Sequence, residues 1–480
     1  MLANLFARKK KDPKVFVIGL DCAPPELVFD AWRHELPNLG RLMSQGVYGE
    51  LLSCIPAITV PAWSSMTSSK DPGTLGFYGF RNRSDYSYDN RYIATGLSVK
   101  EKRVWDILGE AGKQCIVVGV PQTYPVRPVN GHLIACFLTP STTNPRLQWT
   151  HPADLRPEIE RLLAPEVYDV DVPEFRTDDK ARLLEQIYSM TRKHFQVLRY
   201  LLDNKPWDFF MFVEMGTDRI HHGFWAHHDP THFRYDPHSP YRQAIRDYYR
   251  YLDQEVGTLL EQLPPETHIL VVSDHGVKKM EGGICTNEWL RREGYLALLD
   301  EPPAGRLSPF DKVEVDWSRT TAWGDGGYYA RIFLNVAGRE PQGIIPPAEY
   351  QDFRDRLAAQ LQAITDPQGR PLGTVVYKPD QIYQQVRNFA PDLIVYYGDL
   401  AWRSVGSLGF NSIYTFENDT GPDDANHAPS GLFIYTPPNG NLGGRRLPPA
   451  QLMDFAPTVL SIMGLPVPGD MQGKALKVGD

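Results

Sequence analysis

Short runs of apolar residues recur along the chain, and each ends in polar or turn-forming residues. They lie at residues 15–20, 115–120, 208–215, 268–273, 392–397 and 431–435. Uninterrupted apolar runs of this length are typical of strands that are buried on both faces. Stretches with helical periodicity lie between and after them, at 38–46, 103–112, 181–204, 241–263 and 454–464. The alternation predicts an α/β fold whose mostly parallel central sheet is flanked by helices on both faces.

Two long stretches, 140–180 and 295–390, interrupt this alternation. The second is rich in proline and contains a glycine-rich turn, which suits neither regular strands nor long helices. The sequence contains no internal repeat and no low-complexity tract. We therefore expect a single domain over residues 14–480, with an insertion or cap at about 295–390.

The composition is that of an ordinary globular protein. A chain of 480 residues with 42% hydrophobic and 22% charged residues can bury a substantial core. Its net charge of −8 argues against a general nucleic-acid binder. No apolar stretch approaches the roughly 20 residues of a transmembrane helix. The basic residues 1–13 do not follow the order of a signal peptide, so we predict a flexible tail, with weak membrane-surface contact as the alternative.

The cysteines point to a reducing environment. Their number is five, and no two of them form a CxxC pair. This pattern argues against a disulfide framework and against a thiolate zinc site. We therefore predict a cytoplasmic location.

Acidic and imidazole side chains directly follow two of the predicted strands. Asp21 follows the run at 15–20, and Asp274 and His275 follow the run at 268–273. Sites in open α/β sheets gather outside the carboxyl ends of the strands, so these side chains are expected to meet at one edge. Taken singly, each has a structural explanation, because a strand-terminal Asp often caps a turn.

Two further segments supply the same kinds of side chain. Asp218 and His222 stand four residues apart, so on a helix they would share one face and could bind the same ion. His427 lies in a polar loop ahead of the run at 431–435, where an ordinary loop histidine is the alternative. Most of the other histidines between positions 221 and 238 are expected to be surface or hydrogen-bonded residues.

Thr59 is the candidate nucleophile. Pro61 predicts that a helix begins at or just after Thr59. A hydroxyl at a helix N-terminus faces free backbone N–H groups, which favour an alkoxide and bind a phosphoryl oxygen. Ser64 and Ser65 fall inside the same helix, where the first turn would hide them. A threonine that caps the helix without any chemistry is the alternative.

Together these positions supply three carboxylates, three imidazoles and one hydroxyl. Nitrogen and oxygen donors suit hard or borderline divalent ions, Zn²⁺ or alternatively Mn²⁺, in a two-ion site. Two ions about 4 Å apart can stabilise the attacking and leaving oxygens of an in-line displacement together. The pattern therefore predicts a metal-dependent hydrolytic centre.

In these residues and in their order, the chain resembles the alkaline phosphatase superfamily. It looks closest to the type I phosphodiesterase/nucleotide pyrophosphatase branch. The matching features are Asp21 after the first strand, Thr59 ahead of a proline, the DxxxH and DHG motifs, the late His427 and the closing segment 454–476. The resemblance spans about residues 14–478 and implies the fold of that superfamily.

The resemblance also implies a role for each candidate. One ion would be held by Asp218, His222 and His427, and the other by Asp21, Asp274 and His275, with the Thr59 oxygen as a further ligand. The Thr59 hydroxyl would attack phosphorus, and water would then hydrolyse the covalent intermediate. The expected substrate is a small phosphodiester or phosphomonoester.

One position departs from the family pattern. Nucleotide pyrophosphatases of this branch carry Asn three residues after the nucleophile, where it contacts a phosphate oxygen, and this chain has Ala62 there. Asn287 and Lys278 or Lys279 are candidate replacements for that contact. The departure weakens the assignment to nucleotide diesters more than the assignment to phosphorus–oxygen hydrolysis.

Two other functions stay open. Cofactor-independent phosphoglycerate mutases resemble this chain in fold and final helix, but they attack with Ser and carry a large inserted domain, which this chain lacks. A binding protein that keeps its ions for structure alone is the third alternative, and a complete ligand set beside a well-placed hydroxyl argues against it. The sequence does not determine the oligomeric state.

Overall fold

The computed structural model describes residues 12–303, 305–409 and 411–477. Nearly all of the predicted tail at 1–13 therefore lies outside the described residues. The strands of the central sheet are β1 (Lys14–Leu20), β2 (Val47–Leu52), β5 (Cys115–Val118), β6 (Gly131–Ile134), β7 (Thr150–His151), β8 (Phe209–Glu214), β9 (Thr267–Val272), β19 (Ser430–Thr436), β20 (Arg445–Arg446) and β21 (Ala450–Gln451).

The centre of this sheet is parallel. Its order is β20-β2-β19-β9-β1-β8-β5-β6-β7, and β21 pairs with β2. β1 lies between β9 and β8 and is parallel to both, whereas β19 runs antiparallel to β9 and β2. The carboxyl ends of β9, β1 and β8 therefore meet at one edge. Side chains on both faces of β1 are buried, as its unbroken apolar run predicts.

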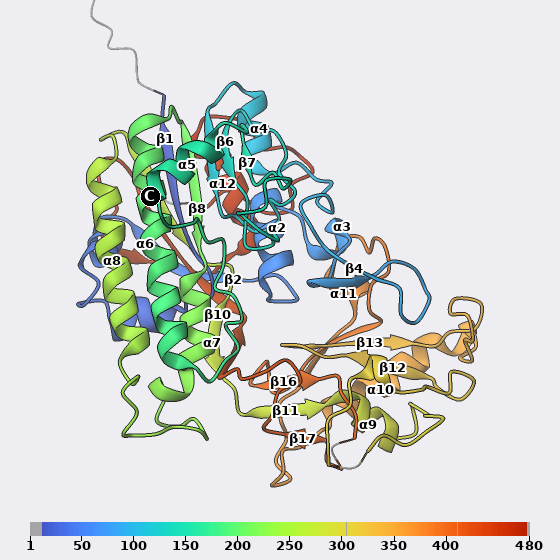
Figure 1. Cartoon of the computed structure of the whole chain (residues 1–480). Coiled ribbons are helices and arrows are strands. Elements are labelled where there is room, and N and C mark those ends of the chain that lie inside the picture. Colours follow the sequence, from blue (N-terminus) through green and yellow to red (C-terminus); the bar gives the residue numbers. More distant parts are fainter. Residues whose placement is uncertain (1–11, 304, 410, 478–480) are drawn as a thin grey trace, which may run out of the picture.

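Helices cover both faces of the sheet. They are α1 (Pro37–Gln45), α2 (Thr59–Ser68), α4 (Val104–Glu110), α5 (Leu155–Leu163), α6 (Lys180–Asn204), α7 (Gly216–His228), α8 (Ala244–Gln262) and α12 (Phe455–Ile462). In Figure 1, α6, α7 and α8 lie on one side of the sheet, and α2, α4 and α12 lie on the other. This arrangement confirms the predicted fold class.

The long helix α6 shows how the sequence sets these positions. The Asp179 side chain accepts a hydrogen bond from the Arg182 N–H and caps the first turn. Apolar side chains at helical spacing, including Leu183, Ile187 and Met190, form one buried face along the helix.

A second lobe is inserted between two paired strands. The chain leaves the body through β10 (Gly276–Lys279) and returns through β18 (Ala425–Ala428), and these strands pair antiparallel with Val277 opposite His427. We call residues 280–424 the inserted lobe. Its elements include β11 (Gly282–Cys285), α9 (Thr286–Arg292), β12 (Ala322–Asp325), β13 (Ala330–Leu334), α10 (Tyr350–Gln362), β14 (Val375–Tyr377), α11 (Pro379–Ile382), β15 (Leu393–Tyr396), β16 (Trp402–Val405) and β17 (Tyr414–Thr415).

The inserted lobe has sheets and an apolar core of its own. β12, β13, β15 and β14 form one sheet, β16, β11 and β17 form another, and Trp289, Trp323 and Leu357 belong to a separate buried cluster. The apolar run at 392–397 thus forms β15 in the lobe. A buried run of strand length does not reveal which sheet it joins.

A hairpin from the body contacts the lobe. It consists of β3 (Arg81–Arg83) and β4 (Arg91–Ile93), and it follows the short helix α3 (Pro72–Leu75). The Tyr88 ring stacks on Trp317 with centroids 3.6 Å apart, and Arg83 pairs with Glu340 at 3.2 Å. The hairpin therefore ties the inserted lobe to the body beside the active edge of the sheet.

The structure also shows the state of the cysteines and whether any described helix could span a membrane. All five cysteines are free and buried. In the part of the chain that is described, no helix combines the length and apolar character needed to cross a bilayer.

Candidate metal centre

Three neighbouring parallel strands deliver the predicted acidic residues to one place. Asp21 follows β1, Asp274 follows β9, and Asp218 lies in the first turn of α7 just after β8. All three carboxylates are buried, with at most 3% of each residue exposed. Burying unpaired carboxylates is costly, so a cluster of this kind requires compensating positive charge.

The first ligand group consists of Asp218, His222 and His427, whose donor atoms all lie within 4.8 Å of one another. On α7, His222 Nε2 lies 3.3 Å from Asp218 Oδ1, as their four-residue spacing predicts. His427 on β18 places Nε2 at 3.9 Å from the same oxygen. Cys22 stands beside this group, but burial raises the pKa of its thiol and its S–H donates to the Gly276 carbonyl.

The second group consists of Asp21, Asp274 and His275, and it meets the same spacing criterion. His275 Nε2 lies 3.2 Å from Asp274 Oδ2 and 3.8 Å from Asp21 Oδ1. The other oxygen of each carboxylate is held in place, because Trp63 Nε1 donates to Asp21 Oδ2 and the Cys22 N–H donates to Asp274 Oδ1. The two sets are the ones that the sequence resemblance implies.

The hydrogen bonds on the far side of each imidazole fix which nitrogen faces the centre. The Nδ1–H of His427 donates to the Ala57 carbonyl at 2.9 Å, and that of His275 donates to the Gly276 carbonyl at 3.1 Å. His222 donates through Nδ1 to an Asp423 carboxylate oxygen at 2.7 Å. A carbonyl or carboxylate only accepts, so every Nε2 presents a lone pair inward whenever the ring is neutral.

Several of the inward atoms have no hydrogen-bond partner. They are Asp21 Oδ1, Asp274 Oδ2, His222 Nε2 and His427 Nε2. Buried polar atoms of this kind are rare unless a bound ion or water satisfies them. The donor set and its unpaired atoms therefore fit two divalent cations held by nitrogen and oxygen ligands.

Thr59 lies beside His275 of the second group and lines the same cavity as Asp218 and His427 of the first. It is the first residue of α2, and Ile58 takes the N-cap position with an extended backbone. Thr59 is therefore not the capping residue, and its Oγ1 lies 3.4 Å from His275 Nε2. The rival hydroxyl of Ser64 is buried inside the helix and donates to the Val60 carbonyl.

The pKa values of the three buried carboxyl groups shift in opposite directions. Burial and the neighbouring Asp218 raise the pKa of Asp21 well above its usual value, and burial and Asp21 do the same for Asp274. Burial opposes ionisation of Asp218 as well, but His222 and Arg219 hold its pKa well below the usual value. Burial lowers the pKa of His275 to about 4, which keeps this ring neutral at pH 7.

Asp423 is a residue of the candidate site that the sequence did not indicate. Its buried carboxylate accepts from His222 Nδ1 through Oδ1, and Oδ2 accepts from Arg176 at 3.1 Å and Arg403 at 3.0 Å. It orients the imidazole of a candidate ligand in the way that carboxylates support metal-binding histidines. In the sequence, Asp423 is marked only by its position four residues before His427. No helical or strand periodicity links the two residues, so this spacing did not indicate a role.

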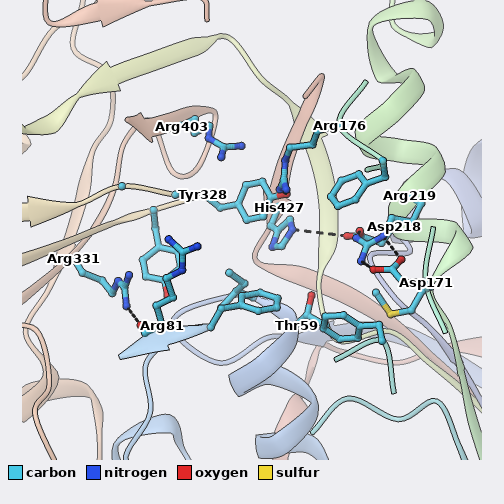
Figure 2. Close-up of a pocket in the computed structure, with 18 residues that line it drawn as sticks. Thr59, Arg81, Asp171, Arg176, Asp218, Arg219, Tyr328, Arg331, Arg403 and His427 are labelled. Carbon is cyan, nitrogen blue, oxygen red and sulfur yellow. Dashed lines mark hydrogen bonds and ion pairs between the residues drawn. The ribbon is translucent and has the colours of Figure 1, made fainter. Parts of the chain in front are cut away.

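A cavity of about 350 Å³ opens onto this centre, a size typical of small-molecule sites. Thr59, Asp218 and His427 line it from the body, and Tyr328 and Arg331 line it from the inserted lobe (Figure 2). The cavity therefore lies between the body and the lobe.

The predicted substrate contacts Asn287 and Lys278 do not line this cavity. Asn287 is fully buried in the lobe, where its amide donates to the Gly324 and Gly406 carbonyls and accepts from the Gly324 N–H. Lys278 donates to Asp399 instead, and Lys279 donates to Thr231. These side chains therefore lie away from the Thr59 cavity, because the chain leaves the body after β10 and Asn287 lies on α9 of the lobe.

The other histidines near α7 have separate environments. His221 is buried against Tyr249 and Trp225, and burial lowers its pKa to about 3. His232 bonds to the Asp424 carbonyl, and His227 bonds to Ser239. Neither of the two ligand groups includes any of these three.

Residues 15–423 match the model of the type I phosphodiesterase/nucleotide pyrophosphatase family. A search of curated proteins gave no match.

Solved structures share the fold over almost the whole chain. An inactive variant of murine ectonucleotide pyrophosphatase/phosphodiesterase 5 in complex with AMP is 12% identical, with a TM-score of 0.54 over 95% of this chain and 96% of that one. Phosphonoacetate hydrolase from Sinorhizobium meliloti 1021 in complex with phosphonoacetate is 16% identical, with a TM-score of 0.59 over 94% and 96%. At these identities the two structures establish the fold alone.

The family match confirms the predicted resemblance and the predicted hydrolase class, and none of these comparisons supports the phosphomutase alternative. The chain belongs to the type I phosphodiesterase/nucleotide pyrophosphatase family, which is a family of phosphoester hydrolases.

Proposed function

We propose that this protein is a metal-dependent phosphohydrolase that cleaves a small phosphodiester or phosphomonoester through a covalent intermediate on Thr59. The observation that carries the proposal is the convergence of two ligand groups, with unpaired inward atoms, beside the Thr59 hydroxyl. The family match supports the reaction class.

The chain's own residues divide the work. Thr59 supplies the attacking oxygen from the first turn of α2, where backbone N–H groups and the helix dipole favour negative charge. The hydroxyl loses its proton to solvent as its oxygen attacks phosphorus, the bond to the leaving group breaks as the new bond forms, and the leaving oxygen takes a proton from solvent. Water then hydrolyses the threonine ester and regenerates the hydroxyl.

Two divalent cations, Zn²⁺ or alternatively Mn²⁺, would be held by the two groups and would supply charge stabilisation for the attacking and leaving oxygens. Asp218, His222 and His427 hold one site, and Asp21, Asp274 and His275 hold the other. Asp423 and Trp63 orient these groups by hydrogen bonds to His222 and Asp21.

We further propose that residues 14–480 act as one catalytic domain in which the inserted lobe serves as a cap over the cavity. Lining residues from both parts support this view. The five free, buried cysteines fit a reducing compartment, so we propose a cytoplasmic location.

The test is p-nitrophenol release from bis-p-nitrophenyl and mono-p-nitrophenyl phosphate after removal of metal and after addition of Zn²⁺ or Mn²⁺. We expect activity only with added metal. Thr59→Ala should lower kcat by about 1,000-fold or more, since the nucleophile is lost.

Ser64→Ala is the matched control, because it removes a neighbouring hydroxyl of the same helix that bonds only to the Val60 carbonyl. This variant should keep near wild-type turnover. Unchanged turnover in Thr59→Ala, or full activity in chelator-treated protein, would reject the mechanism.

A further inference from the structure

Five arginine side chains line the cavity that contains Thr59. They come from distant parts of the chain: Arg81 on β3, Arg176 ahead of α6, Arg219 on α7, Arg331 on β13 and Arg403 on β16. In the view of Figure 2, Arg81 and Arg331 lie to the left of Thr59, and Asp218 and Arg219 lie to its right. The cations therefore surround the position of the nucleophile.

Arg219 belongs to the metal edge. Its Nε and a terminal nitrogen bond both oxygens of Asp171, at 2.7 and 2.8 Å, and the other terminal nitrogen bonds Asp218. Asp171 and Asp218 are the acidic residues of the cavity lining. Both of these carboxylates are thus engaged by Arg219, and neither of them neutralises the other arginines.

Arg176 and Arg403 share a single carboxylate. Oδ2 of Asp423 accepts from both, while Oδ1 is engaged by His222. The Nε of Arg403 is buried and has no hydrogen-bond partner. One carboxylate therefore offsets two guanidinium groups and supports an imidazole as well.

Arg331 and Arg81 are neighbours, since a terminal nitrogen of Arg331 donates to the Arg81 carbonyl, and their charges are also incompletely offset. Arg331 shares Asp325 with Arg91, at 3.2 and 2.7 Å. Arg81 is exposed to the cavity, and its guanidinium forms no ion pair or hydrogen bond with the residues that the structure describes. This side of the cavity thus carries more positive charge than its neighbours neutralise.

The surroundings strengthen the pull of these cations on an anion. Aromatic side chains share the lining, namely Phe80, Phe137, Phe175, Tyr328 and Tyr329. Around the buried guanidinium groups of Arg331 and Arg403, apolar walls lower the local dielectric, so a charge interaction there is stronger than at an open surface. The planar fork of a guanidinium matches phosphate and carboxylate oxygens, which makes arginine the preferred residue for binding such groups.

We propose that the substrate carries a second anionic group, a phosphate or a carboxylate, apart from the phosphorus that reacts at Thr59, and that Arg81 binds this group with Arg331 beside it. The inference rests on the proposed function, because it assigns the substrate class of that same site. The hydrolase thus selects small phosphoesters that are anionic at both ends.

Three matched esters test the proposal: ethyl p-nitrophenyl phosphate, its 2-carboxyethyl analogue and its 2-(phosphonooxy)ethyl analogue. They differ only at the end of one alkyl chain, and p-nitrophenol release reports cleavage at the same phosphorus in each. We expect the metal-loaded wild-type protein to favour at least one anionic ester over the ethyl ester by about 10-fold to 100-fold in kcat/KM. The better of the two anionic esters identifies the group.

Arg81→Gln should reduce that preference to about 3-fold or less, and Arg81→Lys should restore part of it, since the charge returns without the fork. Arg161→Gln, on the exposed face of α5, should keep the wild-type preference. Calorimetric titration of the intact esters into Thr59→Ala should give the same ranking of Kd, which tests recognition without turnover.

The possible failures are separable. If wild-type protein loaded with metal hydrolyses none of the esters, the proposed function fails. If its kcat/KM for the ethyl ester equals that for both anionic esters, the second anionic group is rejected while the hydrolase assignment stands. The same conclusion follows if Arg81→Gln keeps the full preference for an anionic ester.

Discussion

Two regions of the molecule face the same cavity but are built in different ways. The first, the metal-ligand edge, consists of the two candidate ligand groups. The second, the arginine-lined wall, consists of Arg81, Arg176, Arg331 and Arg403. Most of the candidate ligands follow adjacent parallel strands, whereas His427 lies on β18; all are buried, and four of their inward atoms have no hydrogen-bond partner. The arginines come from loops, a hairpin and the inserted lobe, and several share their carboxylates. Strand ends thus fix the reacting centre, while separate segments supply the charge that selects what enters.

Asp423 is the residue that joins the two regions. One of its oxygens holds a candidate metal ligand, and the other holds two arginines of the wall. Changes at the edge should therefore abolish the reaction, whereas changes at the wall should alter which substrate reacts. Variants at Asp423 should affect both.

The largest effect is expected from removing a ligand at the edge. His427→Ala should lower kcat/KM for bis-p-nitrophenyl phosphate by about 1,000-fold and release one bound ion, because only two ligands of that group would remain. Elemental analysis and steady-state kinetics measure the two quantities. His238→Ala, at an exposed position, should change neither. A full complement of metal in His427→Ala would contradict the ligand assignment.

A smaller effect is expected where the two regions meet. Asp423→Asn should weaken binding of one ion by about 10-fold to 100-fold, since the amide supports the His222 ring less well than a carboxylate does. It should also lower the preference for anionic esters. Metal titration and the matched esters measure these changes. Asp424→Asn, next in the chain, should keep metal affinity, and equal losses in both variants would reject a specific role for Asp423.

Trp63 contacts only the metal-ligand edge, through Asp21. Its substitution should therefore affect metal binding alone, and less strongly than the substitution of Asp423. Trp63→Phe removes the 2.7 Å bond to Asp21 and should weaken the second ion by about 10-fold without changing substrate preference. Trp105→Phe is the control, because that buried indole N–H has no partner. A change in ester preference in Trp63→Phe would show that the two regions are coupled more widely.

The smallest expected effect concerns the free energy of unfolding and the contact between His194 and Glu214, at the end of β8. Burial alone lowers the pKa of His194, but Glu214, 3.0 Å away, raises it above the usual value. The protonated ring therefore stabilises the fold below about pH 6.5, and this contribution is lost as pH rises through the higher folded-state pKa. Urea unfolding at pH 6 and pH 9 should show a larger gap between wild type and His194→Gln at pH 6. A gap that grows toward pH 9 would contradict this assignment.

The sequence placed four of the candidate ligands near one edge because each of these four belongs to a local pattern. Asp21 and Asp274 follow apolar runs, and the spacing of Asp218 and His222 matches one helical face. Such patterns determine position, since neighbouring parallel strands end at the same edge. The helix start at Thr59 was readable for the same reason.

The wall could not be predicted, because nothing local marks it. Arg81, Arg331 and Arg403 lie in short strands whose neighbours in space are set by lobe packing. The same dependence on lobe packing determines the place of Asn287, whose amide bonds the backbone inside the lobe. The antiparallel direction of β19 and the membership of β15 in a second sheet also depend on pairing between distant segments.

The pairing of β10 with β18 sets the place of His427 independently of what lies between them. His427 stands opposite Val277, two residues after His275, whatever path the chain takes from Lys279 to Ala425. A lobe that begins and ends on adjoining strands can be lengthened, shortened or exchanged while the candidate ligand atoms on those strands keep their spacing. New specificities can therefore arise in this scaffold by replacing the part of the lobe before Asp423, and a chimaera whose foreign lobe keeps Asp423 should keep the two candidate ligand groups together.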